Sequence, residues 1–169
     1  MAQGRNPRSD RVQFLGKAWI WRIAAVTWMG MIFWSSHRTW EGVGGGFPGM
    51  GNLFHAPLYG VLAFLWAGGL GAWREVPRRL PLIFRLAVSI SVLWGILDEW
   101  HQSFVPGRDP DVFDVLTDFQ GAILGVLVLG FIKAPREGAA RRARQSIALA
   151  MGILATSLGP PFFQRYFGS

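Results

Sequence analysis

The chain has 169 residues, of which 51% are hydrophobic and only 16% are charged. Because soluble domains typically carry about 25% charged residues, the length predicts a single domain and the composition argues against a water-soluble one. The absence of cysteine excludes disulfides, cysteine-ligated metals and thiol nucleophiles. A net charge of +7 could indicate nucleic-acid binding, but the positions of the basic residues indicate a membrane protein instead.

Five apolar stretches follow one another along the chain, at residues 18–36, 53–73, 80–97, 112–132 and 146–163. Each is close to the ~20 residues that a helix needs to cross a bilayer. The first stretch follows several basic residues, but it is rich in Trp and lacks a small-residue cleavage site, so it is interpreted as an uncleaved anchor. The sequence therefore predicts an all-α fold, a polytopic transmembrane helical bundle of about five spans.

The basic residues predict the orientation of these spans. With the N-terminus in the cytoplasm, 14 of the 17 Lys and Arg residues lie on the cytoplasmic side. This asymmetry satisfies the positive-inside rule and predicts a multi-pass protein of the bacterial inner (cytoplasmic) membrane. The predicted organisation is a basic cytoplasmic N-terminus (1–17), a membrane domain (18–132), a basic cytoplasmic loop (133–145) and a fifth span with a short tail (146–169).

Acidic residues concentrate where the third predicted span ends and the fourth begins. Six of the ten Asp and Glu residues lie between positions 98 and 118. Pro106 and Gly107 predict a break between two helices, and Asp109 followed by Pro110 has the form of an N-cap that starts the next helix. The sequence therefore predicts a tight helical hairpin at the outer surface, which carries Asp98, Glu99, His101, Gln102, Arg108, Asp111, Asp114 and Asp118.

The helix after this hairpin has one face of polar and small residues. Asp111, Asp114, Asp118, Gly121 and Gly125 follow a spacing of three and four residues, which places them on one side of a helix. The glycines predict close packing against another helix. A carboxylate near a helix centre costs ~2.5–3.5 kcal/mol in a bilayer. Asp118, which lies deepest of the three acids in this helix, is therefore expected to face protein or water. Two interpretations are open: a functional site, or ion pairs that only hold the hairpin together.

A second polar group lies at the start of the second predicted span. His55 and Tyr59 are one turn apart on one predicted helix face, at the same depth as the acidic hairpin. A helical histidine is often a buried structural residue, whereas its position beside acids favours a functional role. The two interpretations of His55 are equally supported by the sequence. Both residues therefore belong to the predicted site.

Several of these residues form a pattern that resembles the signature of the VanZ-like family. The pattern is Asp98-Glu99-x-His101-Gln102-x-Phe104-x-Pro106-Gly107-Arg108, followed by Asp114-x-x-x-Asp118 and Gly121-x-x-x-Gly125. The resemblance covers about residues 18–132. It implies a small helical membrane protein. Because the family is named for a member associated with teicoplanin resistance, it also implies a ligand among envelope components, such as a cell-wall precursor or its lipid carrier.

Other positions of the chain resemble the same family, with one departure. His55 and Tyr59 match a His and a Tyr of the family's second helix, and Ser35-Ser36 resembles the serine-rich end of its first helix. Gly51 and Asn52 replace an Asp-Lys pair that the family commonly shows. A mechanism that relies on this charged pair is therefore not expected here.

The first functional hypothesis is a site that binds, or acts on, an envelope lipid or glycopeptide-like group. Arg108 would hold a phosphate or carboxylate in bidentate fashion, while Glu99 and Asp114 would position Arg108 or exchange protons. The predicted ligand-binding residues are His55, Tyr59, Asp98, Glu99, Gln102, Arg108 and Asp114.

Two further hypotheses use the same residues. One is a metal-dependent enzyme that acts on a lipid-linked phosphate, with Asp114 and Asp118 as candidate metal ligands. The other is a proton-coupled carrier with Asp118 and His55 as relay groups, for which five spans without an inverted repeat are few. The candidate catalytic residues are Glu99, His101, Asp114 and Asp118. No organic cofactor is expected, and the expected partners are membrane lipids and an envelope lipid or cell-wall precursor, not nucleic acid.

Overall fold

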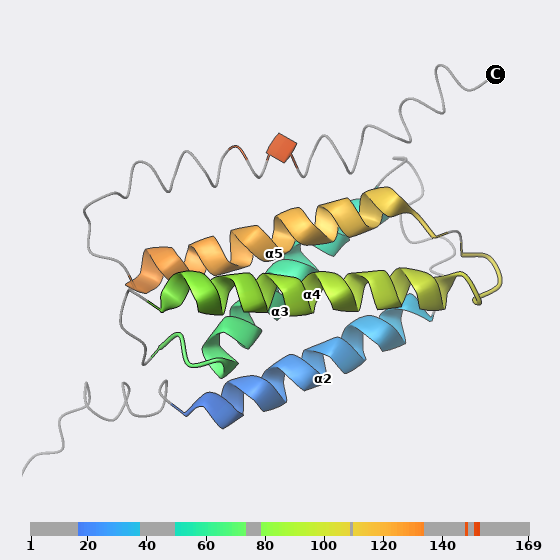
Figure 1. The fold of residues 1–169 in the computed structure, drawn as a ribbon. Coiled ribbons are helices and arrows are strands. Elements are labelled where there is room, and N and C mark those ends of the chain that lie inside the picture. The colour runs from blue at the N-terminus through green and yellow to red at the C-terminus, as the bar shows by residue number, and fades with distance from the viewer. Residues whose placement is uncertain are drawn as a thin grey trace, which may run out of the picture.

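The computed structural model describes residues 17–37, 50–73, 79–108 and 110–133, together with 148, 151 and 152. These residues form a bundle of four long helices, and none of them forms a strand (Figure 1). The prediction of an all-helical fold is therefore confirmed. The helices are α2 (Ala18–Ser36), α3 (Met50–Gly69), α4 (Leu80–Gln102) and α5 (Val112–Lys133).

The helix bounds follow the predicted apolar stretches closely, with two differences. Helix α3 begins three residues before the stretch at 53–73 and ends at Gly69, followed by a turn in which Gly71 has a φ of 97°. Helix α4 continues five residues past its apolar stretch to Gln102, so that its last turns are polar. The predicted fifth span (146–163), the N-terminal segment and the 133–145 loop lie almost entirely outside the described residues.

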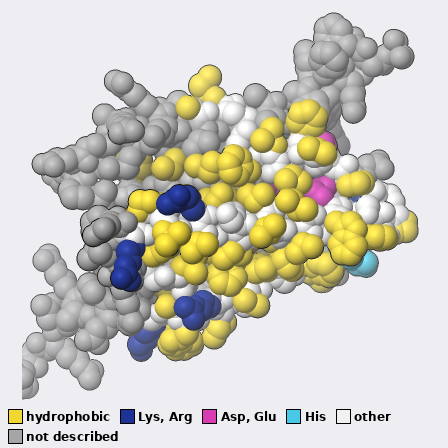
Figure 2. Space-filling view, viewed as in Figure 1, with side chains coloured by type: hydrophobic (Ala, Val, Ile, Leu, Met, Phe, Trp, Pro, Cys, Tyr) yellow, Lys and Arg dark blue, Asp and Glu magenta, His cyan; other side chains and the backbone are white. Residues whose placement is uncertain are grey.

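Two helices of the described chain, α4 and α5, are long and apolar enough to cross a membrane. The bundle also exposes many large apolar side chains, as the helices of a soluble domain rarely do. Figure 2 shows an apolar surface with Lys and Arg at one end of the bundle and acidic and His side chains at the other. The structure thus supports a helical bundle with two candidate spans, and the larger number of about five remains a prediction. Among the exposed side chains are Trp19, Ile23, Phe54, Leu93, Trp100 and Ile132.

Helix α3 is the centre of the bundle, because it packs against each of the other three helices and most extensively against α5. The close approach of α3 and α5 depends on glycine. A Cβ atom at Gly121 would collide with the backbone of Ala56, and one at Gly125 with the backbone of Gly60. The predicted small face of α5 therefore packs against α3, and this packing accompanies the approach of His55 on α3 to Asp114 and Asp118 on α5.

Helix α2 is attached mainly to α3. The Trp28 indole donates a hydrogen bond to the Leu58 carbonyl (2.9 Å), and Arg22 Nε donates one to the Gly69 carbonyl (2.8 Å). Contact between α2 and α4 is much slighter than that between α2 and α3. Side chains of α2 and α4 meet at the polar ends of the two helices, where Ser36 contacts Asp98 and Phe33 contacts His101.

The turn from α4 to α5 differs from the prediction in its capping residue. Gly107 has a φ of 81°, which suits the expected break. Helix α5 begins at Val112, however, and Asp111 Oδ1 accepts a hydrogen bond from the Phe113 amide (2.8 Å). The prediction that Asp109 and Pro110 start the helix was therefore two residues early, because Asp111 is the residue whose carboxylate reaches a free amide of the first turn.

Candidate functional site

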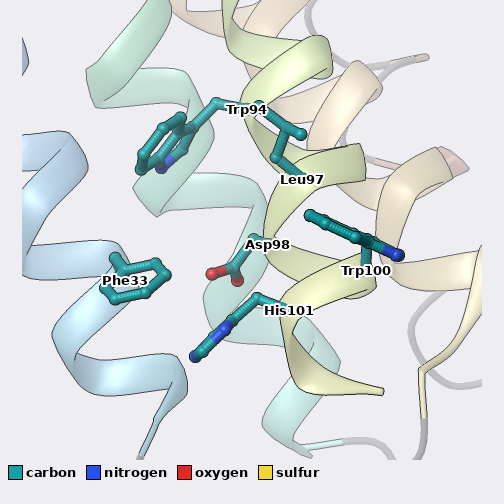
Figure 3. A pocket seen from close by; sticks show the side chains of 6 residues that line it. All are labelled: Phe33, Trp94, Leu97, Asp98, Trp100 and His101. Atoms are coloured by element: carbon teal, nitrogen blue, oxygen red, sulfur yellow. The ribbon is translucent and has the colours of Figure 1, made fainter. Parts of the chain in front are cut away.

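The side of α4 that faces α2 carries a hydrogen-bonded carboxylate. Asp98 is 2% exposed, and its Oδ2 accepts hydrogen bonds from the Ser36 hydroxyl (2.6 Å) and the Gln102 amide (3.1 Å). His101 lies beside it, with its ring 4.3 Å from that of Phe33 and its Nε2 3.4 Å from His37 Nδ1. Figure 3 shows Asp98 and His101 pointing from α4 toward Phe33 on α2.

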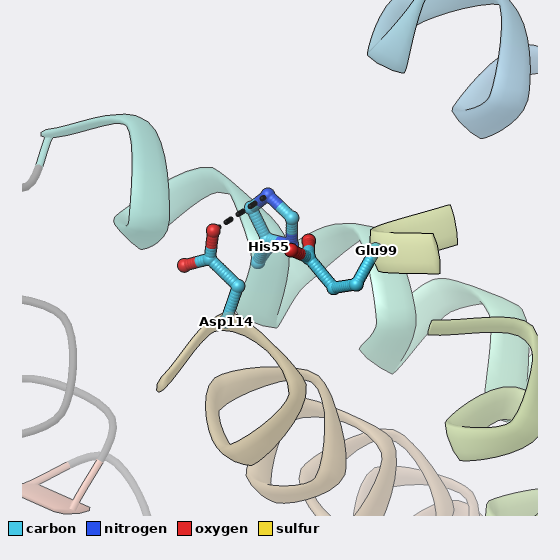
Figure 4. Close-up of side chains that lie close together, drawn as sticks. All are labelled: His55, Glu99 and Asp114. Carbon is cyan, nitrogen blue, oxygen red and sulfur yellow. Dashed lines mark ion pairs between the residues drawn. The ribbon is translucent and has the colours of Figure 1, made fainter. Parts of the chain in front are cut away.

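A second polar cluster lies where α3, α4 and α5 meet, and it contains His55, Glu99, Asp114 and Asp118. Figure 4 shows the first three of these side chains close together. His55 Nδ1 is 3.0 Å from Asp118 Oδ1, and His55 Nε2 is 3.8 Å from Asp114 Oδ2. Asp118 is 1% exposed, Glu99 6% and Asp114 9%. The cluster therefore holds three buried carboxylates around one imidazole.

The geometry of the imidazole leaves one ring nitrogen directed at acidic groups. If His55 Nδ1–H donates to Asp118, then the Nε2 lone pair of the neutral ring lies toward another acceptor, Asp114. Such an arrangement is favourable only when a proton or a metal cation lies between them. Ligand atoms from His55, Glu99 and Asp114 all lie within 4.8 Å of one another, which is close enough for one cation to contact all three.

Gln102 connects the two sides of α4. Its Nε2 donates to Asp98 Oδ2 and also to Glu99 Oε1 (3.2 Å). The other Glu99 oxygen accepts the Asp111 amide hydrogen at 2.8 Å. Glu99 thus fixes the start of α5 against the end of α4, in addition to facing the His55 cluster.

Several polar atoms of these groups are buried without a hydrogen-bond partner in the described structure. They are the Tyr59 hydroxyl and one carboxylate oxygen each of Asp98, Asp114 and Asp118. An unsatisfied buried polar atom costs ~1–3 kcal/mol, and such costs are common at sites that bind a ligand. The tight approach of Asp118 to α4 requires Gly95, since a Cβ there would lie 2.5 Å from Asp118 Oδ2.

The predicted site residues therefore divide into two groups on different sides of α4. His55, Tyr59, Glu99, Asp114 and Asp118 share the α3–α5 side. Asp98 and His101 face α2, and Gln102 joins the two groups.

Arg108 lies apart from the acids that were expected to position it. Its Nε donates to the Ser36 carbonyl at 3.4 Å. Within the described residues, no carboxylate oxygen lies within 4.0 Å of its guanidinium. The close ion pairs that were expected between Arg108 and the carboxylates of Glu99 and Asp114 are therefore absent among the described residues.

Sequence reasoning did not assign roles to Phe33, Ser36, Trp94 or Gly95. The serine was noted only as part of a resemblance, and its contact with Asp98 joins residues 62 positions apart. No local pattern marks Gly95, since its importance depends on a carboxylate from another helix.

A family model described as VanZ/LLP1 matches residues 4–133, which is most of the chain. The chain belongs to the VanZ-like family. The match includes both polar groups described above and begins earlier than the resemblance in the sequence suggested. Comparison of the VanZ-like chain with curated proteins and with solved structures gives no match.

Proposed function

We propose that this VanZ-like chain is an integral protein of the bacterial inner membrane that binds, or acts on, an envelope lipid or glycopeptide-like group, with a link to glycopeptide (teicoplanin-type) resistance. In this proposal its N-terminus is cytoplasmic, the chain crosses the membrane about five times, and the turn between α4 and α5 lies outside. The asymmetry of the basic residues supports this orientation.

The observation that carries the proposal is the cluster of buried carboxylates around His55. Burying three acids beside one imidazole is costly unless a further group compensates them. A purely structural staple would pair each acid with a cation or a donor. Asp114 and Asp118 instead each keep one oxygen unpartnered in the described structure, which favours a ligand.

Arg108 is the residue proposed to hold an anionic group. A guanidinium carries five N–H donors in a planar fork, and only the bond from Nε to Ser36 is seen in the described chain. Its other donors would match a phosphate or carboxylate in bidentate fashion. Asp114 and Glu99 would then act from the opposite side of α4, on a proton or on a polar group of the same ligand.

A second candidate function is metal-dependent chemistry on a lipid-linked phosphate, and the proximity of His55, Glu99 and Asp114 favours it. The hydrogen bond between His55 Nδ1 and Asp118 has the form in which a carboxylate orients a metal-bound imidazole. In this reading Asp118 positions His55 instead of binding the metal. A bound divalent cation would polarise the phosphate.

The lipid-binding proposal is tested by identifying lipids that co-purify with the full chain. The wild type is compared with Asp114→Asn and Arg108→Ala, and with Glu137→Gln, in the predicted cytoplasmic loop, as a carboxylate-to-amide control. We expect an envelope lipid to be retained by the wild type and the control and to be lost from the two site variants. If all four proteins carry the same lipids after matched purification, the proposal is wrong.

The metal alternative has a separate test. The protein is freed of metal with a chelator, and binding of Mg²⁺, Mn²⁺ and Zn²⁺ is measured by calorimetry and elemental analysis. About one ion per chain, lost in Glu99→Gln and Asp114→Asn, would support the enzyme. Absence of saturable binding in the wild type would exclude it.

A further inference from the structure

The space between α2 and the polar end of α4 is a pocket of about 180 Å³, lined by Phe33, Trp94, Leu97, Asp98, Trp100 and His101. Its size is about ten times the ~15 Å³ that one water molecule needs. Most of its lining is aromatic, with one buried carboxylate among the rings. Figure 3 shows the rings of Phe33, Trp94 and His101 on the side of α4 toward which Asp98 points.

The carboxylate in this pocket makes no ion pair with the described residues. Asp98 Oδ2 receives two hydrogen bonds from neutral donors, whereas Asp98 Oδ1 is buried without a partner in the described structure. No Lys, Arg or His nitrogen of the described chain lies within 4.0 Å of either oxygen. A charge buried in this way, in a helix long enough to span a membrane, is expected to have a counter-ion.

The rings supply the rest of the recognition chemistry. Aromatic faces attract cations, most strongly when the site is shielded from water. The Trp94 indole N–H, on another residue that lines the pocket, is likewise buried without an acceptor in the described structure. An ammonium group in this pocket would meet aromatic rings and the unpartnered oxygen of Asp98.

The surroundings of the pocket indicate that this ammonium belongs to a lipid. Phe33 is 42% exposed, Leu97 50% and Trp100 64%, so the lining side chains continue onto an apolar outer surface. A soluble amine would gain nothing from that surface, whereas the chains of a lipid would cover it. The Asp98 oxygen needs an N–H donor, which a primary ammonium has and a quaternary one lacks.

We propose that the pocket between α2 and α4 binds the primary ammonium head group of a membrane lipid, through Asp98 Oδ1 and the surrounding aromatic rings. This inference deepens the proposed function and rests on it in placing the chain in a membrane. It concerns a different side of α4 from the His55 cluster. It therefore names an amine-bearing lipid class without depending on what that cluster binds.

The test uses the full chain in nanodiscs of phosphatidylglycerol that contain a small fraction of a second lipid. That lipid is phosphatidylethanolamine, its N-methyl or N,N-dimethyl derivative, or phosphatidylcholine, and the lipid retained by the protein is quantified by mass spectrometry. We expect retention to fall along the series and to drop by about tenfold when the last N–H is lost, as for a charge-assisted hydrogen bond. Equal retention of all four lipids by the wild type would overturn the proposal without any variant.

Variants then assign the effect to the pocket. Asp98→Asn should abolish the preference for phosphatidylethanolamine, and the matched change Glu137→Gln should leave it intact. Preference that survives in a monodisperse Asp98→Asn protein would overturn the proposal. Soluble phosphoethanolamine, added in excess, should compete only weakly, because it lacks the apolar chains; full competition would overturn the assignment to a lipid.

The two proposals fail in different ways. Retention of an envelope lipid with no discrimination among amines would overturn the ammonium pocket alone. Discrimination among amines, with no lipid lost from Asp114→Asn or Arg108→Ala, would overturn the proposed envelope-lipid site alone.

Discussion

His55 on α3 and Asp118 on α5 meet through Nδ1 and Oδ1 at 3.0 Å, although they are 63 residues apart in the sequence. Asp118 is almost completely buried, and in the described chain this imidazole is the only group that pairs with its carboxylate. The contact therefore fixes the relative rotation of two helices and at the same time orients the ring nitrogen that faces Asp114.

Removing this contact should destabilise the bundle. A hydrogen bond to a charged group contributes ~1.5–3 kcal/mol, and Asp118→Asn retains the shape while removing the charge. We expect a clear fall in the midpoint of thermal unfolding in detergent, measured by size-exclusion chromatography with fluorescence detection. Asp111→Asn, at a partly exposed carboxylate, is the control and should have a smaller effect. An unchanged midpoint in Asp118→Asn would show that the contact does not contribute to stability.

The packing of α3 against α5 predicts that alanine is tolerated at one glycine of α5 and not at another. Gly125→Ala would place a methyl group against the Gly60 backbone, and backbone cannot move aside as a flexible side chain can. Overpacking of this kind costs ~1–3 kcal/mol. Gly130→Ala is the matched control, since its Cβ would meet Phe84 at an ordinary 3.5 Å. We expect low yield of folded protein for the first variant and normal yield for the second; equal yields would contradict the close approach.

The role of Arg108 is tested by separating abundance from activity. Arg108 donates a hydrogen bond to the Ser36 carbonyl and makes no ion pair with Glu99 in the described chain. Arg108→Ala should therefore leave membrane abundance near normal while impairing the envelope phenotype severely. Arg108→Lys should recover little, since an ammonium cannot reproduce a planar fork. The phenotype is scored in the envelope-stress or glycopeptide assay that distinguishes the null strain.

A double variant tests the alternative that Arg108 only pairs with an acid to hold the hairpin together. If the residue were only a charge staple, Arg108→Gln together with Glu99→Gln would restore abundance lost in Arg108→Ala. We expect no such recovery. A normal phenotype in Arg108→Ala would leave the packing of the hairpin as the better explanation.

The proposed orientation can be tested directly, because the chain has no native cysteine. Ser103→Cys and Arg78→Cys are labelled separately with a membrane-impermeant maleimide in intact cells. We expect modification at 103 and protection at 78, as the positive-inside rule requires. Modification at 78 alone would reverse the orientation. Gly168→Cys tests the fifth span and should be labelled from outside; labelling only after lysis would place residues 146–163 at the inner leaflet.

The helices and the closeness of α3 to α5 were predictable because each has a local signal. Apolar stretches of about twenty residues mark the helices, and Gly121 and Gly125 on one face mark the packing surface of α5. The spacing of Asp114 and Asp118 likewise placed both on that buried face. Helical spacing places Asp98 and Glu99 on adjoining faces, but the sequence did not reveal that Asp98 contacts α2 while Glu99 contacts the start of α5. That outcome depends on where α2 lies, which no residue near the acids encodes.

The amide of Gln102 has two hydrogens and gives one contact to Asp98 and one to Glu99. The strength of each contact depends on the charge of its carboxylate, and both contacts come from the same nitrogen, Gln102 Nε2. A group bound at Asp98 and a group bound at Glu99 would therefore both act on a single side chain, which lies about one helical turn from each acid. If a group bound at one carboxylate changes the affinity at the other through this amide, the reverse effect has the same factor, because linkage is reciprocal.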